Sequence, residues 1–124
     1  MGSVGTTNNI GINTKQFEYE APALEAGKPT KYSRDAFDEN YRAAQRLVEG
    51  NPDANYMMAS LYRNDEMAVM STQTLKGIQY LINQERENID IDLDFGVIPQ
   101  STADTLKKSL NVVQRTLNNQ WKNR

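Results

Sequence analysis

Three aspartates at alternate positions, Asp90, Asp92 and Asp94, are the strongest candidates for chemistry in this sequence. They belong to the run 89–95, in which apolar and acidic residues alternate without interruption, a pattern typical of a half-buried β-strand. Alternate side chains of a strand share one face, so three carboxylates could offer oxygen ligands to Ca²⁺ or Mg²⁺. We therefore predict one short strand at 89–95, and the sequence leaves open whether its aspartates bind a cation.

The spacing around these aspartates departs from the calcium loop of EF-hand proteins. Counting from Asp90, the sixth position is Phe95, where that loop needs a glycine, and the twelfth is Ser101, where it needs a glutamate. The alternative is a strand whose acidic outer face discourages edge-to-edge pairing with other chains. We predict no metal site and no cofactor.

The composition excludes several classes of enzyme. The chain has 124 residues, with no cysteine and no histidine. Disulfides, thiolate nucleophiles, zinc–thiolate sites and histidine-based catalysis are therefore impossible. Gly2, Gly5 and Gly11 fit neither the P-loop nor the dinucleotide-binding fingerprint. We predict that the protein is not an enzyme and has no catalytic residue.

The charges are unevenly distributed along the chain, whose formal net charge is −2. Residues 33–100 carry six positive and twelve negative side chains, whereas 101–124 carry five positive and one negative. An acidic body and a basic end can pair head to tail with another copy, or fold back within one chain. The acidic whole does not favour nucleic-acid binding, although Trp121 beside Lys122 and Arg124 could stack on a base.

The first 32 residues have the composition of an extended arm. They hold four of the seven glycines and two of the four prolines, and their large apolar residues are scattered. Such a segment buries too little apolar surface to offset its ordering entropy, so we expect it to order on contact with neighbours. We divide the chain into an N-terminal arm, 1–32, and a helical domain, 33–124.

Hydrophobic periodicity predicts a mainly α fold with two to four helices. A first helix should begin at Ser33 as N-cap and run to about residue 49, with Gly50 as a stop signal. A long central helix should follow from about 53 to 87, with a break near Asn64–Asp65 as the alternative. Within it, Gly77 weakens the helix or lets another backbone come close.

The last helix has the most regular apolar stripe in the chain. We expect it to run from Thr102 to about Trp121, behind a capping-box-like sequence at 101–104. Its apolar residues recur at intervals of three and four, which places them on one face. They are Ala103, Leu106, Leu110, Val113, Leu117 and Trp121.

These features favour a non-enzymatic structural or assembly subunit of a multi-protein complex, and a bacteriophage virion component, at the head, neck or tail, fits this description. The alternative is a stand-alone small binding protein, such as an inhibitor, chaperone or adaptor, acting through a helix face or the acidic strand. The expected partners are copies of the chain or other subunits. No stretch reads as a signal peptide or membrane span, and the location, virion or cytoplasm, stays open. The predicted interface residues are Ile10, Ile12, Phe17, Tyr19, Met57, Leu61, Leu106, Leu110, Leu117 and Trp121.

Overall fold

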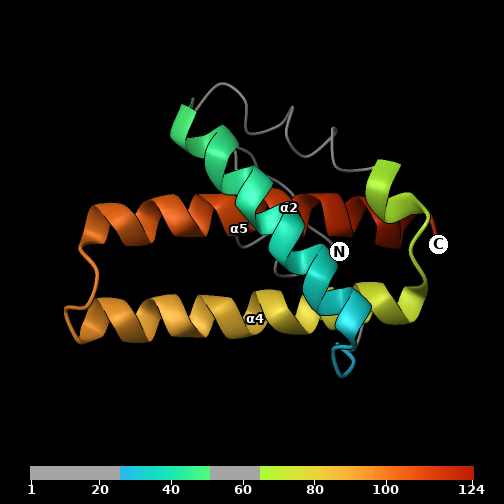
Figure 1. The fold of residues 1–124 in the computed structure, drawn as a ribbon, viewed down its shortest axis with the longest axis horizontal. Helices are drawn as coiled ribbons and strands as arrows, with labels where there is room; N and C mark the ends of the chain where they lie inside the picture. The colour runs from blue at the N-terminus through green and yellow to red at the C-terminus, as the bar shows by residue number, and fades with distance from the viewer. Residues whose placement is uncertain (1–25, 51–64) are drawn as a thin grey trace.

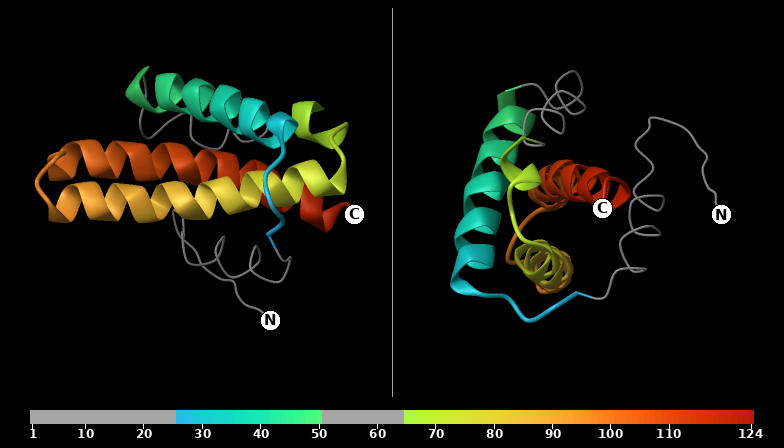
Figure 2. Two further views of the ribbon diagram at one scale, coloured as in Figure 1. Left: turned by 60° about the horizontal axis from the view of Figure 1, so that its bottom comes forward. Right: turned by 90° about the vertical axis from the view of Figure 1, so that its right-hand side faces the viewer.

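Three long helices pack together in this protein. The computed structural model describes residues 26–50 and 65–124, in which the long helices are α2 (Lys31–Gly50), α4 (Thr72–Asp94) and α5 (Gln100–Lys122). Helices α4 and α5 run side by side in opposite directions, and α2 crosses them both (Figures 1 and 2). Each of the three contacts the other two. The predicted mainly α fold is confirmed.

The apolar stripe of the last helix forms the centre of the core. Ala103, Leu110, Val113 and Leu117 of α5 have no exposed surface. They pack in one cluster with apolar residues of α2 and α4. The helix begins at Gln100, two residues earlier than predicted, and its N-cap is Pro99, which makes no side-chain capping hydrogen bond. The predicted capping box at 101–104 is therefore wrong.

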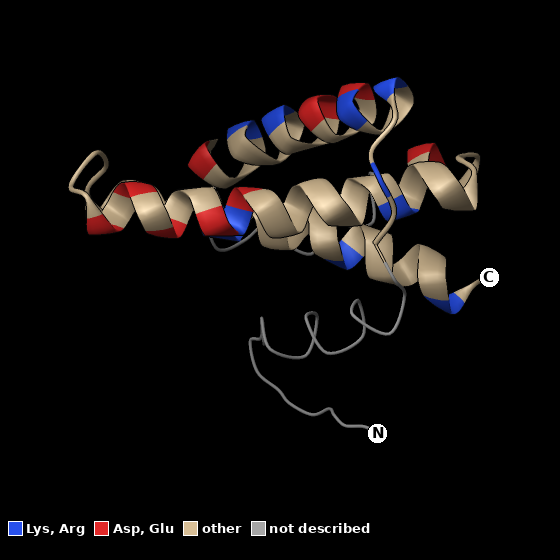
Figure 3. Ribbon diagram, turned by 90° about the horizontal axis from the view of Figure 1, so that it is seen from below, with Lys and Arg blue, Asp and Glu red and all other residues tan. Residues whose placement is uncertain are grey.

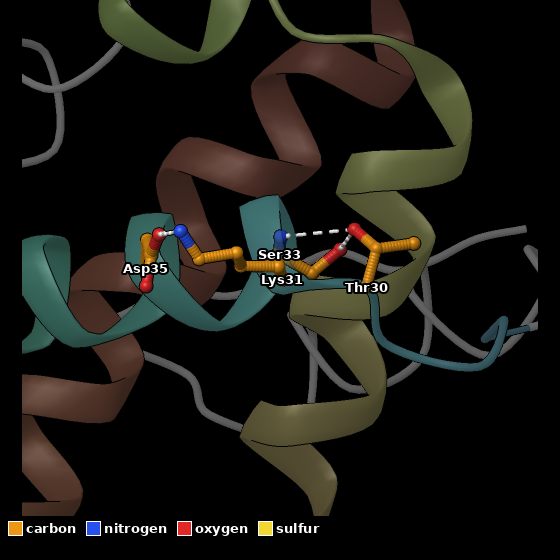
Figure 4. A network of polar contacts seen from close by, with 4 residues as sticks. All are labelled: Thr30, Lys31, Ser33 and Asp35. Atoms are coloured by element: carbon orange, nitrogen blue, oxygen red, sulfur yellow. Dashed lines mark hydrogen bonds and ion pairs between the residues drawn. The ribbon is translucent and has the colours of Figure 1, made fainter.

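Helix α2 begins two residues before the predicted start, and Thr30 takes the capping role assigned to Ser33. The Thr30 hydroxyl accepts a hydrogen bond from the backbone N–H of Ser33 at 3.2 Å (Figure 4). Ser33 is fully buried inside the helix, and its hydroxyl donates to the carbonyl oxygen of Thr74 on α4 at 3.0 Å. Ser33 thus ties α2 to α4 instead of capping α2.

Gly77 allows the start of α2 to lie directly against α4. A β-carbon at this glycine would lie 2.7 Å from Cβ of Ser33 and 3.0 Å from Cα of Pro29. The backbone N–H of Gly27 also donates to the carbonyl oxygen of Lys76 at 3.3 Å. The structure therefore confirms the prediction that Gly77 lets another backbone come close.

The predicted continuous central helix is wrong in the part that the structure describes. Residues 65–68 are helical, the chain then leaves the helix, and α4 begins at Thr72. Ser71 caps α4, since its hydroxyl accepts from the backbone N–H of Thr74 at 3.1 Å. Arg124 braces this break, because its Nη2 donates to the carbonyl oxygen of Met70 at 2.7 Å and, at longer range, to that of Met67.

The predicted strand at 89–95 is also wrong, because α4 continues through Asp94. Ile89 is buried, and Leu93 packs against the core four residues later. This spacing extends the inward row formed by Ile78 and Ile82, so the segment follows a helical period. The intervening Ile91 points outward and is 47% exposed. The strand-like alternation of apolar residues therefore combines two positions that pack in the core, Ile89 and Leu93, with the exposed Ile91 between them.

A buried pair of amides joins α4 to α5 within the core. Gln79 and Gln114 exchange two hydrogen bonds, at 2.9 and 2.7 Å. The second proton of each amide group goes to a neighbour on the same helix, Asn83 for Gln79 and Asn118 for Gln114. This pairing holds only at one register of the two helices, so it fixes how far α4 slides along α5.

Candidate protein-interaction site

Asp90, Asp92 and Asp94 do not converge on one face of α4. Successive residues of a helix are rotated by about 100°, so Asp92 points away from the face shared by Asp90 and Asp94. Asp90 forms an ion pair with Lys107 of α5, with 2.7 Å between Oδ1 and Nζ. In the described ranges, no group of three acidic residues is placed to hold a metal ion.

Four of the predicted interface residues lie in α5, where they serve the packing of the chain itself. Leu110 and Leu117 are completely buried. Leu106 and Trp121 are partly buried and pack against the same core. Their contact with another protein stays a prediction. The other six lie outside the described residues: Ile10, Ile12, Phe17, Tyr19, Met57 and Leu61.

The turn between α4 and α5 exposes large apolar side chains instead. Phe95 is 80% exposed, Val97 68% and Ile91 47%. Ile91 and Phe95 are four residues apart, so they are neighbours on the same side of the helix end. We call Ile91, Phe95 and Val97 the apolar tip.

The backbone of the turn holds the apolar tip in place. The N–H of Gly96 donates to the carbonyl oxygen of Leu93 at 3.1 Å, and that of Val97 to the oxygen of Asp92 at 2.8 Å. These two bonds, with φ of +73° at Gly96, make a Schellman motif. In this motif the residue after the glycine, here Val97, commonly contacts apolar residues of the last helical turn.

Acidic residues flank the apolar tip. Asp92 and Asp94 belong to the last turn of α4, and Figure 3 shows acidic residues along the half of α4 that leads to the turn. Asp90 is paired with Lys107, as described above. The tip therefore combines exposed apolar area with negative charge, a combination that suits a cationic protein surface with apolar side chains of its own.

The opposite end of the hairpin carries positive charge. Lys28, Lys31 and Arg34 are exposed around the start of α2, and Tyr32 between them is 76% exposed. The nearest acidic residue along the helix is Asp35, whose Oδ2 lies 4.0 Å from Nζ of Lys31 (Figure 4). We call Lys28, Lys31, Tyr32 and Arg34 the basic end.

Ionisable groups also meet where α2 packs on α4. Burial raises the pKa of the Tyr41 phenol above its usual range, and the charge of Glu85 raises it further. Burial likewise raises the pKa of the Glu85 carboxyl, and the nearby charges of Asp92 and Asp38 act in the same direction. Because both pKa values are shifted by burial, this contact is a source of pH-dependent stability.

The apolar tip was not predicted from the sequence, although the sequence carries a signal for it. Continuing the inward row from Ile82 through Ile89 to Leu93 places Ile91 and Phe95 off the buried face. Gly96 then follows the last helical residues as a stop signal. The basic end was missed because residues 28–32 were assigned to the arm.

Comparisons with protein-family models, with curated proteins and with solved structures find no match to this chain. Among the described residues, no helix is both long and apolar enough to cross a membrane.

Proposed function

We propose that this chain is a non-enzymatic assembly subunit of a multi-protein complex, which binds copies of itself or other subunits. The apolar tip is the observation that supports the proposal. Single exposed apolar residues are common on protein surfaces, whereas grouped ones mark interaction sites. Here Phe95 and Val97 expose most of their surface within three residues of each other.

The construction of the tip supports the same proposal. Two backbone hydrogen bonds fix the conformation of the turn that carries it. The amide pair of Gln79 and Gln114 fixes the register of the two helices on either side of the turn. A surface that is already ordered loses less conformational entropy on binding than a loose loop does. The hairpin therefore presents its apolar side chains in a binding-ready arrangement.

The kind of assembly that we propose is inferred from the sequence alone. The part of the arm that precedes the described residues, 1–25, carries the alternating pairs Ile10/Ile12 and Phe17/Tyr19. We propose that this part orders on contact with neighbouring subunits. A bacteriophage virion, at its head, neck or tail, is the assembly that we propose for such a subunit. The alternative is a stand-alone binding protein that uses the apolar tip to engage a single partner.

The mass of the chain in solution distinguishes the two functions. Light scattering should be measured over a range of protein concentrations, on the full chain and on a variant that lacks residues 1–25. The deletion stops there because Gly27 and Thr30 hold the start of α2. We expect the full chain to exceed its monomer mass of 14.1 kDa and the deletion to lower the measured mass. If both forms stay monomeric, assembly from copies of this chain is wrong and the binding-protein alternative is favoured.

A further inference from the structure

The apolar tip and the basic end lie at opposite ends of the same molecule. Ser33 is bound to Thr74, which places the basic end beside the first turn of α4. The tip follows the last residue of α4, Asp94. Twenty helical residues separate Thr74 from Asp94, a length of about 30 Å at 1.5 Å per residue. The two surfaces therefore cannot touch within one chain (Figure 1).

The two surfaces are complementary in charge and in chemistry. At the apolar tip, the exposed ring of Phe95 lies close to the carboxylates of Asp92 and Asp94. At the basic end, the exposed ring of Tyr32 lies among three exposed cations. The rings of Phe95 and Tyr32 could pack edge to face or offset. In that contact the negative charges beside the tip would face the positive charges of the basic end. Among the described residues, the exposed aromatic side chains are Tyr32, Tyr80 and Phe95, and of these Phe95 is the most exposed and Tyr32 the next.

We propose that the apolar tip of one copy docks on the basic end of another, so that copies associate head to tail. In this contact Phe95 packs against Tyr32, and Asp92 and Asp94 face the cations at the start of α2. The inference rests on the proposed function, because it names the surfaces through which the subunit meets its own copies. A head-to-tail contact leaves one free surface at each end, so it builds rings or open chains.

The contact is small, and its strength follows from its size. Three apolar side chains and one aromatic partner bury less than the roughly 1,200 Å² that marks the lower limit of stable interfaces. We therefore expect association that depends steeply on protein concentration. Much of the attraction is between exposed charges, so it should weaken at about 1 M salt, where the screening length falls to about 3 Å.

Complementation between two variants of the full chain tests the inference. Phe95→Ser removes the aromatic ring of the tip, and Tyr32→Ser removes that of the basic end. Each variant alone should self-associate at least tenfold more weakly than the wild type in sedimentation velocity. An equal mixture should recover part of the association, because the intact tip of the Tyr32→Ser chain fits the intact basic end of the Phe95→Ser chain.

A control and a charge exchange sharpen the test. Tyr80→Ser changes an aromatic residue of α4 that belongs to neither surface, so self-association should stay as in the wild type. Asp94→Lys and Arg34→Glu should each weaken association, and a chain carrying both changes should recover part of it. Circular dichroism melting of each variant shows that its fold is intact.

The outcomes separate this inference from the proposed function. If the wild type associates but Phe95→Ser and Tyr32→Ser leave its mass unchanged, the assembly function stands and the head-to-tail contact is wrong. If only Phe95→Ser weakens association, the tip binds a different surface, and the inference is overturned. If the wild type is monomeric at every concentration, both the inference and assembly from copies of this chain are wrong.

Discussion

At the scale of single residues, Glu85 links the stability of the fold to pH. Its pKa is raised in the folded chain, above all by burial and then by the charges of Asp92 and Asp38, although a hydrogen bond with Asn88 acts in the opposite direction. Between the unfolded and folded pKa values, the native state binds more protons than the unfolded state. Stability associated with this group is therefore lost as pH rises through that window.

We predict that Glu85→Gln makes the chain more stable at neutral pH, because the variant never ionises beside those carboxylates. The gain should disappear below pH of about 4, where the glutamate of the unfolded wild type is also protonated. Urea unfolding at a series of pH values measures the difference. Glu87→Gln, an exposed change on the same helix, is the control and should alter stability by less than about 0.5 kcal/mol. Equal stability of Glu85→Gln and wild type at neutral pH would contradict the prediction.

At the scale of the elements, the register of α4 and α5 depends on the amide pair. In Gln114→Leu, the amide of Gln79 loses both hydrogen bonds to its partner while it stays buried. We predict a loss of about 1–3 kcal/mol in the free energy of unfolding, the usual cost of an unpaired buried polar group.

Replacing both glutamines tests whether that loss comes from the unpaired amide. Gln79→Leu/Gln114→Leu should be much less destabilised than the sum of the two single variants, because no buried amide is then left without its partner. Gln84→Leu, an exposed change on α4, serves as the control. Strictly additive losses in urea unfolding would show that the two amides do not act as a pair.

The last helix could be predicted because all the apolar residues in its periodic pattern pack into the same core. The apolar residues of α5 recur at intervals of three and four from Ala103 to Trp121, and the polar Gln114 buried beside them does not break that period. The strand prediction for 89–95 was wrong because core-packed and exposed apolar residues alternate in that segment. Ile89 and Leu93 follow the core, whereas Ile91 and Phe95 serve the exposed tip, and together they give the period of a strand.

Capping residues were harder to predict than the helices themselves. Thr30 and Ser33 each carry a hydroxyl that can cap a helix by accepting a backbone N–H two or three residues later. The sequence alone does not say which of the two does so. The structure decides by burial, since Ser33 contacts α4 across 41 residues of sequence. Long-range contacts of this kind override local preferences.

At the scale of the whole molecule, the docking of α2 on the hairpin depends on one missing side chain. We predict that Gly77→Ala destabilises the chain by about 1–2 kcal/mol. Overpacking costs about 1–3 kcal/mol, and the better helix propensity of alanine recovers up to about 1 kcal/mol of it. Thermal unfolding followed by circular dichroism measures the change.

A second glycine provides the matched control for this variant. Gly50 ends α2, and a β-carbon built there would meet no atom within 4 Å. Gly50→Ala should therefore leave stability unchanged or raise it slightly. If Gly77→Ala behaves like Gly50→Ala, the close approach of Ser33 and Pro29 does not limit the packing of α2.

The candidate site could be predicted only in part, for a reason that belongs to the whole fold. The amphipathic stripe identified residues able to bind apolar surfaces, but the chain uses Leu110 and Leu117 in its own core. Only the folded arrangement shows which apolar residues remain uncovered. The sequence pattern places Ile91 and Phe95 off the buried face, but only the fold shows that they and Val97 stay exposed.

The short turn at 95–99 also bears on the order in which the chain folds. Helices α4 and α5 are joined by five residues, whereas the bond from Ser33 to Thr74 closes a loop of 41. The longer closure costs about 2 kcal/mol more in chain entropy. We therefore expect the hairpin to form its native contacts first and α2 to pack last on the surface that the hairpin provides.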